Sequence, residues 1–210
     1  MMRGSVLGAV LVTALALWAS SCLGATTVRV LSISGERVDL LVNGSITRSL
    51  YRGETSAEGV YVVEVRDGSA LIEVEGKSFQ MVPGSSTAPS VVLQADPRGH
   101  FLVEIAINGT PIRALVDTGA SSVALNLEDA RRMGVDLIGA PSIMVQTAAG
   151  PRRALRARLD SVQLGDIVLQ NIQATVSETN DLPIVLLGMS FLDRLDMQRS
   201  GRTLILTRRF

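Results

Sequence analysis

Short runs of alternating apolar and polar residues fill the chain from residue 26 to residue 82, and each has the length of a β-strand. Asn43-Gly44 and Asp67-Gly68 separate successive runs. Both dipeptides favour two-residue hairpin turns, in which each central position needs a positive φ. The pattern predicts a small all-β domain over residues 26–82, and we detect no internal repeat within the chain. The clearest predicted strands cover residues 28–33, 38–42, 60–65 and 70–74.

A second β region follows a linker. Residues 83–90 are small and polar and include two prolines, a composition typical of a connection between domains. Beyond the linker, residues 101–107 alternate in polarity, and residues 111–116 form a second predicted strand that runs directly into Asp117. Residues 128–134 predict one short helix, because acidic residues stand at its start and a glycine at its end. We therefore expect a second, mainly β domain over residues 91–210.

The first 25 residues have the composition of a targeting segment. Arg3 precedes an unbroken apolar run over residues 6–18, and small residues suited to cleavage follow. The uncharged stretch is also long enough to span a bilayer, which takes about 20 apolar residues. Cys22 follows Ala-Ser-Ser, which loosely resembles a bacterial lipoprotein box. We expect residues 1–25 to be a signal peptide or membrane anchor, and cleavage, lipidation at Cys22 and retention stay open.

This segment predicts where the rest of the chain is located. We expect the remainder in the bacterial periplasm, or anchored to the inner membrane with the second domain outside the cytoplasm. A membrane is a partner only if the segment is retained.

The composition excludes several classes of function. Basic and acidic side chains balance at 20 each, so the net charge gives no reason to expect a nucleic-acid partner. A structural zinc site needs about four ligands, mainly Cys and His, and the chain has one His and one Cys. No intrachain disulfide can form. A Ser-His-Asp triad would depend on His100, whose Pro-Arg-Gly-His context predicts a solvated turn. We expect no metal and no cofactor.

Asp117 carries the strongest chemical signal. It begins the sequence Asp117-Thr118-Gly119-Ala120, directly after an apolar strand. This arrangement places a carboxylate in a tight turn, where Gly119 lets the backbone close on the carboxylate and the Thr118 hydroxyl can hold the turn. The tripeptide Asp-Thr-Gly alone is a weak signal, because three common residues recur by chance.

Further motifs, in their order along the chain, give the signal its specificity. A second apolar strand ends in Leu186-Leu187-Gly188 and continues into Met-Ser-Phe-Leu. Together with the Asp117 turn and a predicted hairpin over residues 145–150, this order makes residues 91–210 closely resemble the retroviral-like (retropepsin-type, clan AA) aspartic proteases of bacteria. The resemblance implies a mainly β fold: a closed six-stranded-type retropepsin barrel with one short helix, preceded by the small β domain and the N-terminal hydrophobic segment.

The resemblance also implies an aspartic endopeptidase that acts on a protein or peptide. Its reaction needs two Asp carboxylates that share one proton across an activated water, because two like charges about 3 Å apart cannot both be ionised. The chain holds one Asp-Thr-Gly and is too short for the two lobes of a pepsin-like monomer. The second carboxylate is therefore expected from another copy, in a C2 homodimer.

Other positions take their expected roles from the same resemblance. Thr118 is expected to brace the turn across the dimer, and Gly119 is expected to approach the substrate with its backbone. Leu186, Leu187 and Gly188 are expected to support the turn. A flap is expected to cover the peptide and exclude water. Its residues are Thr147, Ala148, Ala149 and Gly150.

Two departures from related proteins limit these expectations. The flap has no Tyr or Trp, and Met189 stands where viral members usually carry Arg. We therefore expect neither an aromatic flap contact nor a dimer brace that depends on Arg. The C-terminal strand over residues 203–207 is expected to contribute to a dimer sheet, as it does in viral relatives.

Two alternatives to the protease remain. One is a non-catalytic module that binds an envelope partner on a retropepsin-like fold. The other is a membrane-linked secretion or pilus accessory protein, because the turn rhythm of residues 60–77 weakly resembles small periplasmic β domains of such proteins. A pure binding module has no physical need for a carboxylate in the Asp117 turn, which favours the protease.

Four arginines follow the predicted flap: Arg152, Arg153, Arg156 and Arg158. A solvated hairpin face is the favoured interpretation of this basic stretch. Attraction of acidic substrates or of lipid headgroups is the alternative.

Overall fold

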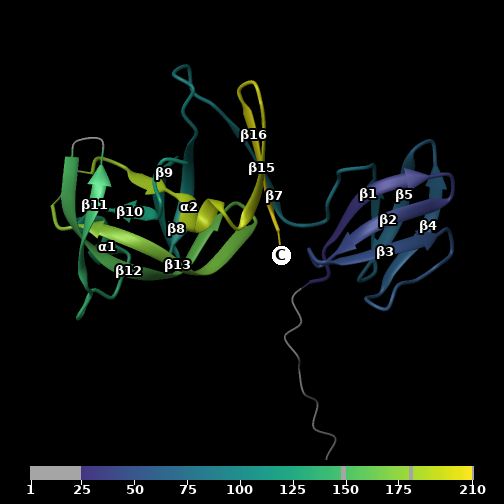
Figure 1. Ribbon diagram of the computed structural model, residues 1–210, viewed down its shortest axis with the longest axis horizontal. Coiled ribbons are helices and arrows are strands. Elements are labelled where there is room, and N and C mark those ends of the chain that lie inside the picture. The colour runs from purple at the N-terminus through teal and green to yellow at the C-terminus, as the bar shows by residue number, and fades with distance from the viewer. Residues whose placement is uncertain (1–24, 148–149, 180–181, 210) are drawn as a thin grey trace, which may run out of the picture.

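The computed structural model describes residues 25–147, 150–179 and 182–209, and in Figure 1 these residues form two β-rich lobes. The smaller lobe contains β1 to β6. The larger lobe contains β8 to β14 and both helices, and a sheet made of β7, β15 and β16 lies on its side nearer the smaller lobe. The two lobes have separate hydrophobic cores, built mainly from aliphatic side chains.

The smaller lobe consists of two antiparallel three-stranded sheets. The first is β1 (Val28–Ser34), β2 (Arg37–Val42) and β3 (Ile46–Tyr51), and the second is β4 (Val60–Arg66), β5 (Ser69–Val74) and β6 (Lys77–Met81). Turn chemistry sets these hairpins. Asn43 and Gly44 have φ values of 51° and 71°, and Asp67 and Gly68 have 49° and 74°. The predicted hairpins are thus confirmed, and the strands β3 and β6 are additions to the prediction.

The two sheets repeat one another, which contradicts the expectation of no internal repeat. Each sheet has a β-bulge at the same place in its first strand, between Val30 and Ser32 and between Val62 and Glu64. The buried side chains also correspond: Val28 with Val60, Val30 with Val62, Val38 with Ala70, Leu40 with Ile72, Val42 with Val74, and Leu50 with Met81. The small lobe is therefore a duplicated three-stranded meander whose two halves share one core.

Asp39 on β2 gives the small lobe a pH-dependent element. Its carboxylate accepts hydrogen bonds from Ser49 Oγ at 2.6 Å, Ser32 Oγ at 2.7 Å and Arg37 at 3.1 Å. The Ser49 hydroxyl, with help from Ser32 and Arg37, lowers the pKa of Asp39. Because the folded-state pKa lies below the unfolded one, this stabilisation is present above the unfolded pKa and is lost as pH falls through the folded pKa.

Replacing Asp39 with Asn is expected to lower the free energy of unfolding of the small lobe by about 1 kcal/mol at pH 7. It is also expected to flatten the fall in stability between pH 6 and pH 3. Urea unfolding, followed at both pH values, measures the two effects. The matched control is Glu73→Gln on β5, because Glu73 makes no side-chain hydrogen bond among the described residues. Equal pH slopes in wild type and Asp39→Asn would contradict the assignment.

The larger lobe contains a closed six-stranded barrel, as predicted. Its strands are neighbours in the order β12 (Gly150–Leu164), β13 (Ile167–Ser177), β10 (Val123–Leu125), β14 (Val185–Leu187), β9 (Thr110–Val116) and β8 (Leu102–Ile107). Pairing of Val162 with Ile107 and of Gln163 with Ala106 returns from β12 to β8 and closes the ring. β11 (Ser142–Thr147) pairs only with the first part of β12, so this hairpin extends from the barrel.

Two short helices accompany the barrel, where one was predicted. The predicted helix is α1 (Leu127–Arg132), and Asn126 caps it by accepting a hydrogen bond from the Asp129 N–H at 2.7 Å. The second helix, α2 (Met189–Leu192), is a single turn that buries Phe191 and Leu192. Its sequence carries no charged residue in its first or last turn and no capping side chain, so the usual signals of a helix are absent.

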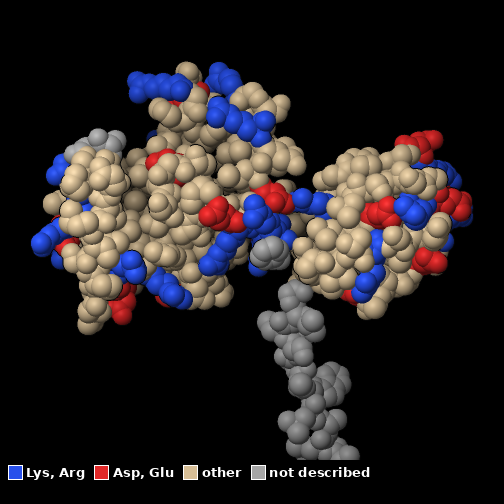
Figure 2. Space-filling model, in the orientation of Figure 1, with Lys and Arg blue, Asp and Glu red and all other residues tan. Residues whose placement is uncertain are grey.

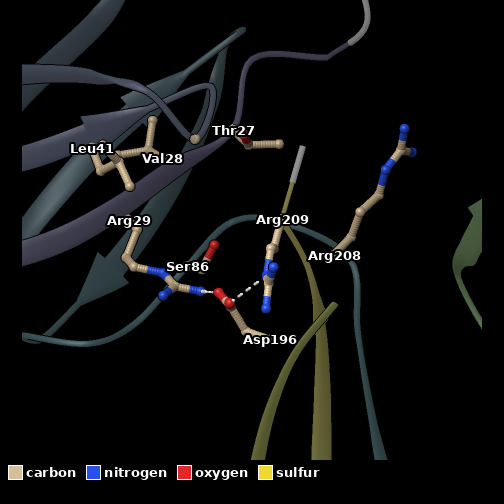
Figure 3. A pocket seen from close by; sticks show the side chains of 9 residues that line it. Thr27, Val28, Arg29, Leu41, Ser86, Asp196, Arg208 and Arg209 are labelled. Atoms are coloured by element: carbon tan, nitrogen blue, oxygen red, sulfur yellow. Dashed lines mark hydrogen bonds and ion pairs between the residues drawn. The ribbon is translucent and has the colours of Figure 1, made fainter. Parts of the chain in front are cut away.

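The third sheet links the two lobes. It is antiparallel, with β16 (Thr203–Arg208) between β15 (Leu195–Ser200) and β7 (Ser90–Gln94). Asp196 on β15 receives ion pairs from Arg29 on β1 and from Arg209, the latter at 2.9 Å, and Figure 3 shows both guanidinium groups converging on its carboxylate. These residues line a cavity of about 180 Å³ between the lobes.

The predicted linker lies against β1. The Gly84 N–H donates to Val30 O at 2.8 Å, and the Thr87 N–H donates to Val28 O at 2.8 Å. β7 begins at Ser90, the last residue of the predicted linker. The division into domains at residues 26–82, 83–90 and 91–210 stays a prediction about independent folding.

The predicted targeting segment, including Cys22, lies outside the described residues apart from Ala25. Within the ranges that the structure describes, no helix is long and apolar enough to cross a membrane. On the face shown in Figure 2, basic and acidic side chains are interspersed over both lobes. This agrees with the balanced charge of the sequence.

Candidate active site

Asp117 directly follows β9, in the interior of the barrel sheet. Its N–H donates to Leu187 O at 3.1 Å, which continues the parallel pairing of β9 with β14. The turn then closes twice. The Gly119 N–H donates to Asp117 Oδ1 at 2.8 Å, and the Ala120 N–H donates to Asp117 O at 3.3 Å. The predicted turn is therefore present, and its own backbone orients one carboxylate oxygen.

The chain that follows the Leu186-Leu187-Gly188 strand crosses the Asp117 turn at close range. The Met189 N–H donates to Ala120 O at 2.8 Å, and the Ser190 N–H donates to Ser121 O at 3.1 Å. Gly188 lies at the crossing, where a Cβ atom would stand 2.2 Å from Ser122 O. Only glycine fits there, so the sequence Leu-Leu-Gly supports the Asp117 turn by letting two backbone segments touch.

Hydroxyl groups form hydrogen bonds on the other side of the turn. No sequence motif had indicated them. Ser190 Oγ donates to Gln173 O at 2.7 Å and accepts from the buried Val123 N–H at 3.0 Å. Ser122 and Thr175 share a hydrogen bond at 3.2 Å. These contacts tie α2, β10 and β13 together behind the Asp117 turn. Only the strand register reveals them, because the partners are far apart in sequence.

Strand alternation gives the barrel a core face and an outer face. Val116, Leu187 and Val123 belong to the hydrophobic core. Their neighbours in sequence point the other way. Asp117 follows two residues after Leu115, still paired with β14 through its N–H and partly exposed, so alternation places it on that outer face. One residue from each barrel strand forms a continuous registered row there, called the outer row below: Leu102, Leu115, Leu186, Ala124, Thr175 and Arg156.

The outer row forms a half-buried surface beside the carboxylate. Leu115, Leu186, Ala124 and Thr175 are each partly exposed, whereas their neighbours along each strand are buried or pack against the core. Leu186 was predicted to support the turn. The register places it on this surface, paired with Leu115, and its supporting role stays a prediction, whereas Leu187 and Gly188 make backbone contacts with the turn.

The predicted flap hairpin is present as β11 and β12. These strands pair without irregularity from Ser142 opposite Leu155 to Thr147 opposite Gly150, and Thr147 Oγ1 donates to Gly150 O at 2.7 Å. Ala148 and Ala149, at the predicted flap tip, lie outside the described residues. Contact between the flap and a substrate stays a prediction, as does the dimer brace assigned to the exposed Thr118.

The described residues also bear on metal-dependent and His-dependent chemistry. His100 is exposed in a turn, where its N–H donates to Asp96 Oδ1 at 2.9 Å. The described part of the chain contains no group of three or more His, Cys, Asp or Glu side chains that could hold a metal ion. A cavity of about 440 Å³ reaches from Leu102 and Ile112 to Pro183 and Ile184, and Asp117 does not line it.

Comparison with known proteins points to the same region of the chain. Residues 103–194 match the family described as gag-polyprotein putative aspartyl protease. The chain is 40% identical over 125 residues to an uncharacterized protein in the cobV 5′ region of Sinorhizobium sp, which covers 56% of this chain and 54% of that protein. It is 35% identical over 123 residues to the uncharacterized protein RP867 of Rickettsia prowazekii (strain Madrid E), covering 58% and 52%.

A solved structure extends the likeness to the fold. The crystal structure of a retropepsin-like aspartic protease from Rickettsia conorii is 35% identical to this chain. The match covers 58% of this chain and 92% of that protein, with a TM-score of 0.51. By contrast, this chain spans about half the length of the two curated relatives it matches.

Proposed function

The chain belongs to the bacterial retropepsin-like aspartic protease family, and on this basis we propose that it hydrolyses peptide bonds as a homodimer with Asp117 of each subunit in the active site. The observation that carries the proposal is the Asp117 carboxylate on the outer face of the barrel, oriented by the Gly119 N–H. A non-catalytic module would not need an oriented, accessible carboxylate at this position.

The proposed chemistry needs no group beyond the two carboxylates and water. The ionised Asp117 of one subunit removes a proton from water, and the water oxygen attacks the scissile carbonyl carbon. The protonated Asp117 of the other subunit donates its proton to the carbonyl oxygen. The tetrahedral intermediate then collapses as a proton passes to the amide nitrogen and the C–N bond breaks. One carboxylic acid and one amine are released.

A dimer is part of the proposal because one chain supplies one such carboxylate. The C-terminal strand was expected to contribute to a dimer sheet. Since β16 is hydrogen-bonded on both sides within the chain, a partner strand would have to pair with β7 or β15 instead. Val92 on β7 is 60% exposed and shares the outward face of this sheet with Ile205.

We propose that the β11–β12 hairpin closes over the bound peptide, which would exclude water from the two carboxylates. We also propose that the enzyme works outside the cytoplasm, in the periplasm or tethered to the inner membrane. That location rests on the apolar run over residues 6–18 and on the small residues after it.

If the active enzyme is a dimer, its specific activity should depend on protein concentration. Cleavage of a quenched fluorescent peptide library by the full chain in mild detergent is expected to show a specific activity that falls as the protein is diluted, because only dimers hold two carboxylates. Sedimentation in the same buffer is expected to show the dimer population falling over the same range. A strictly monomeric chain that cuts peptides, or a dimer that cuts none between pH 3 and pH 7, would overturn the proposal.

A further inference from the structure

Strand alternation sorts the basic stretch of β12 into two faces. β12 pairs in unbroken register with β11 from Gly150 to Leu155 and with β13 from Ala154 to Leu159, so side chains alternate regularly along this segment. Arg156 is opposite Thr175, which places it in the outer row. Arg152 lies on the same face of β12 as Arg156, and Arg153 lies on the opposite face.

Burial shows which face of the flap hairpin is turned toward the protein. On the face of Arg152, Ala154 is 2% exposed, and its partner Ile143 and the nearby Val145 are half-buried. On the face of Arg153, its partner Met144 is 62% exposed. Arg152 is therefore on the inner side of the hairpin, on the face continuous with the outer row beside Asp117.

Both inner arginines are available to a ligand. Arg152 and Arg156 are exposed, and neither guanidinium group forms a hydrogen bond or an ion pair within the part of the chain that the structure describes. Glu178, an acidic residue near the base of the hairpin, receives a hydrogen bond from Ser142 instead. Two guanidinium groups thus lie along the surface where the proposed substrate would bind, and no carboxylate among the described residues forms an ion pair with them.

We propose that Arg152 and Arg156 select peptides that carry Asp or Glu a few residues from the scissile bond. This inference rests on the proposed function, because it assumes that the peptide lies between the flap and the Asp117 turn. The guanidinium group binds carboxylates through paired N–H donors, which makes an arginine pair suited to an acidic side chain of a peptide.

The register of the barrel strands also predicts which position of the peptide carries the acidic residue. Neighbouring strands lie about 4.8 Å apart, so Arg156 is roughly 10 Å from Ala124, which lies two strands away. An extended peptide advances about 3.4 Å per residue. The acid that reaches Arg156 is therefore expected about three residues beyond the side chain that contacts Ala124. Arg152, nearer the tip of the hairpin, is expected to reach an acid closer to the scissile bond.

The test measures binding and cleavage separately. Fluorescent peptides that differ only by Glu or Gln, placed in turn at two to five residues from the cleaved bond, are titrated against full-length Asp117→Asn protein by anisotropy. The same peptides are then digested with the catalytically intact chain. At one or more positions, Glu is expected to bind about fivefold more tightly than Gln, the strength of a favourable exposed ion pair, and the preference is expected to shrink in high salt.

Single substitutions assign the preference to the inner face. Arg152→Gln or Arg156→Gln is expected to bring the Glu to Gln ratio to about one at the position each residue reads. Arg153→Gln removes the same charge from the same strand on the opposite face, and it is expected to keep the ratio. Equal binding of Glu and Gln peptides at every position, or an equal loss in Arg153→Gln, would overturn the inference.

The separate readouts also distinguish other failures. Cleavage of both peptides without any acid preference would leave the proposed function intact and refute only the role of the arginines. Acid-selective binding without cleavage by the intact chain would refute the proposed function and support the arginine site. If Arg152→Gln weakens binding to vesicles of phosphatidylglycerol and phosphatidylcholine but leaves peptide preference unchanged, the arginines serve a membrane surface and the inference is wrong.

Discussion

Replacing Asp117 with Asn is expected to lower kcat/KM for peptide cleavage by at least about a thousandfold, because the substitution removes both carboxylates of the proposed dimer at once. The fold is expected to survive. The Asn side-chain oxygen can still accept the Gly119 N–H that now meets Asp117 Oδ1 at 2.8 Å. Thermal unfolding should therefore differ by no more than about 1 kcal/mol, the net value of one hydrogen bond. Peptide digestion and unfolding of the same preparation measure both effects.

Mixing experiments with this variant separate a shared active site from two independent ones. If subunits exchange freely and a mixed dimer is inactive, adding an equal amount of Asp117→Asn protein should reduce the wild-type activity to about half, since half of the wild-type subunits then pair with the variant. Unchanged activity after exchange would mean that one carboxylate suffices, and the dimer mechanism would be wrong. Undiminished cleavage by the variant alone would remove Asp117 from the chemistry altogether.

The sequence predicted the hairpins of the small lobe because their information is local. Asn43-Gly44 and Asp67-Gly68 adopt positive φ as expected. The strands β3 and β6 were not predicted because each buries a single residue, Leu50 or Met81, and exposes or half-exposes the others. Ile46 and Phe79 also pack against the core, but two core-facing apolar residues in each strand make an alternation too short to stand out in the sequence.

The duplication in the small lobe was not predicted for a related reason. Corresponding core positions hold similar aliphatic residues, such as Leu40 and Ile72, but the positions between them are under no common constraint. Asp39 and its hydroxyl partners have no counterpart in the second sheet, where Leu71 takes the corresponding place. When only the buried, alternate positions of two segments hold similar residues, strand register and burial reveal the repeat, whereas the sequence does not.

In the candidate site, too, the features formed by residues adjacent in sequence were predicted, and the contacts between residues far apart in sequence were not. The Asp117 turn was predictable because three adjacent residues and one preceding strand define it. The hydrogen bonds of Ser190 on α2 were not predictable, because the fold of the barrel brings Val123 and Gln173 next to Ser190. The sequence also grouped Arg152 and Arg153 together, although strand alternation places them on opposite faces of one hairpin.

Replacing Gly188 with Ala is expected to disrupt the barrel, because the added methyl group has no room. The new Cβ would lie 2.2 Å from Ser122 O and 2.7 Å from Ala120 O, and both atoms are backbone atoms that cannot rotate away. The chain must separate the Asp117 turn from α2, which would strain or break the hydrogen bonds that Ala120 O and Ser121 O accept at 2.8 and 3.1 Å. We expect a loss of about 3 kcal/mol of stability.

Calorimetry should show this loss as a fall of about 6–12 °C in the Tm of the barrel, together with a loss of peptide cleavage as the turn moves. Gly109→Ala is the matched control, because Gly109 has a φ of 80° and open space around its missing Cβ. That variant suffers backbone strain without a collision, and about 1–2 kcal/mol is expected from strain alone. If Gly188→Ala unfolds at the same temperature as Gly109→Ala or above it, the close crossing of the two segments is not what requires glycine at residue 188.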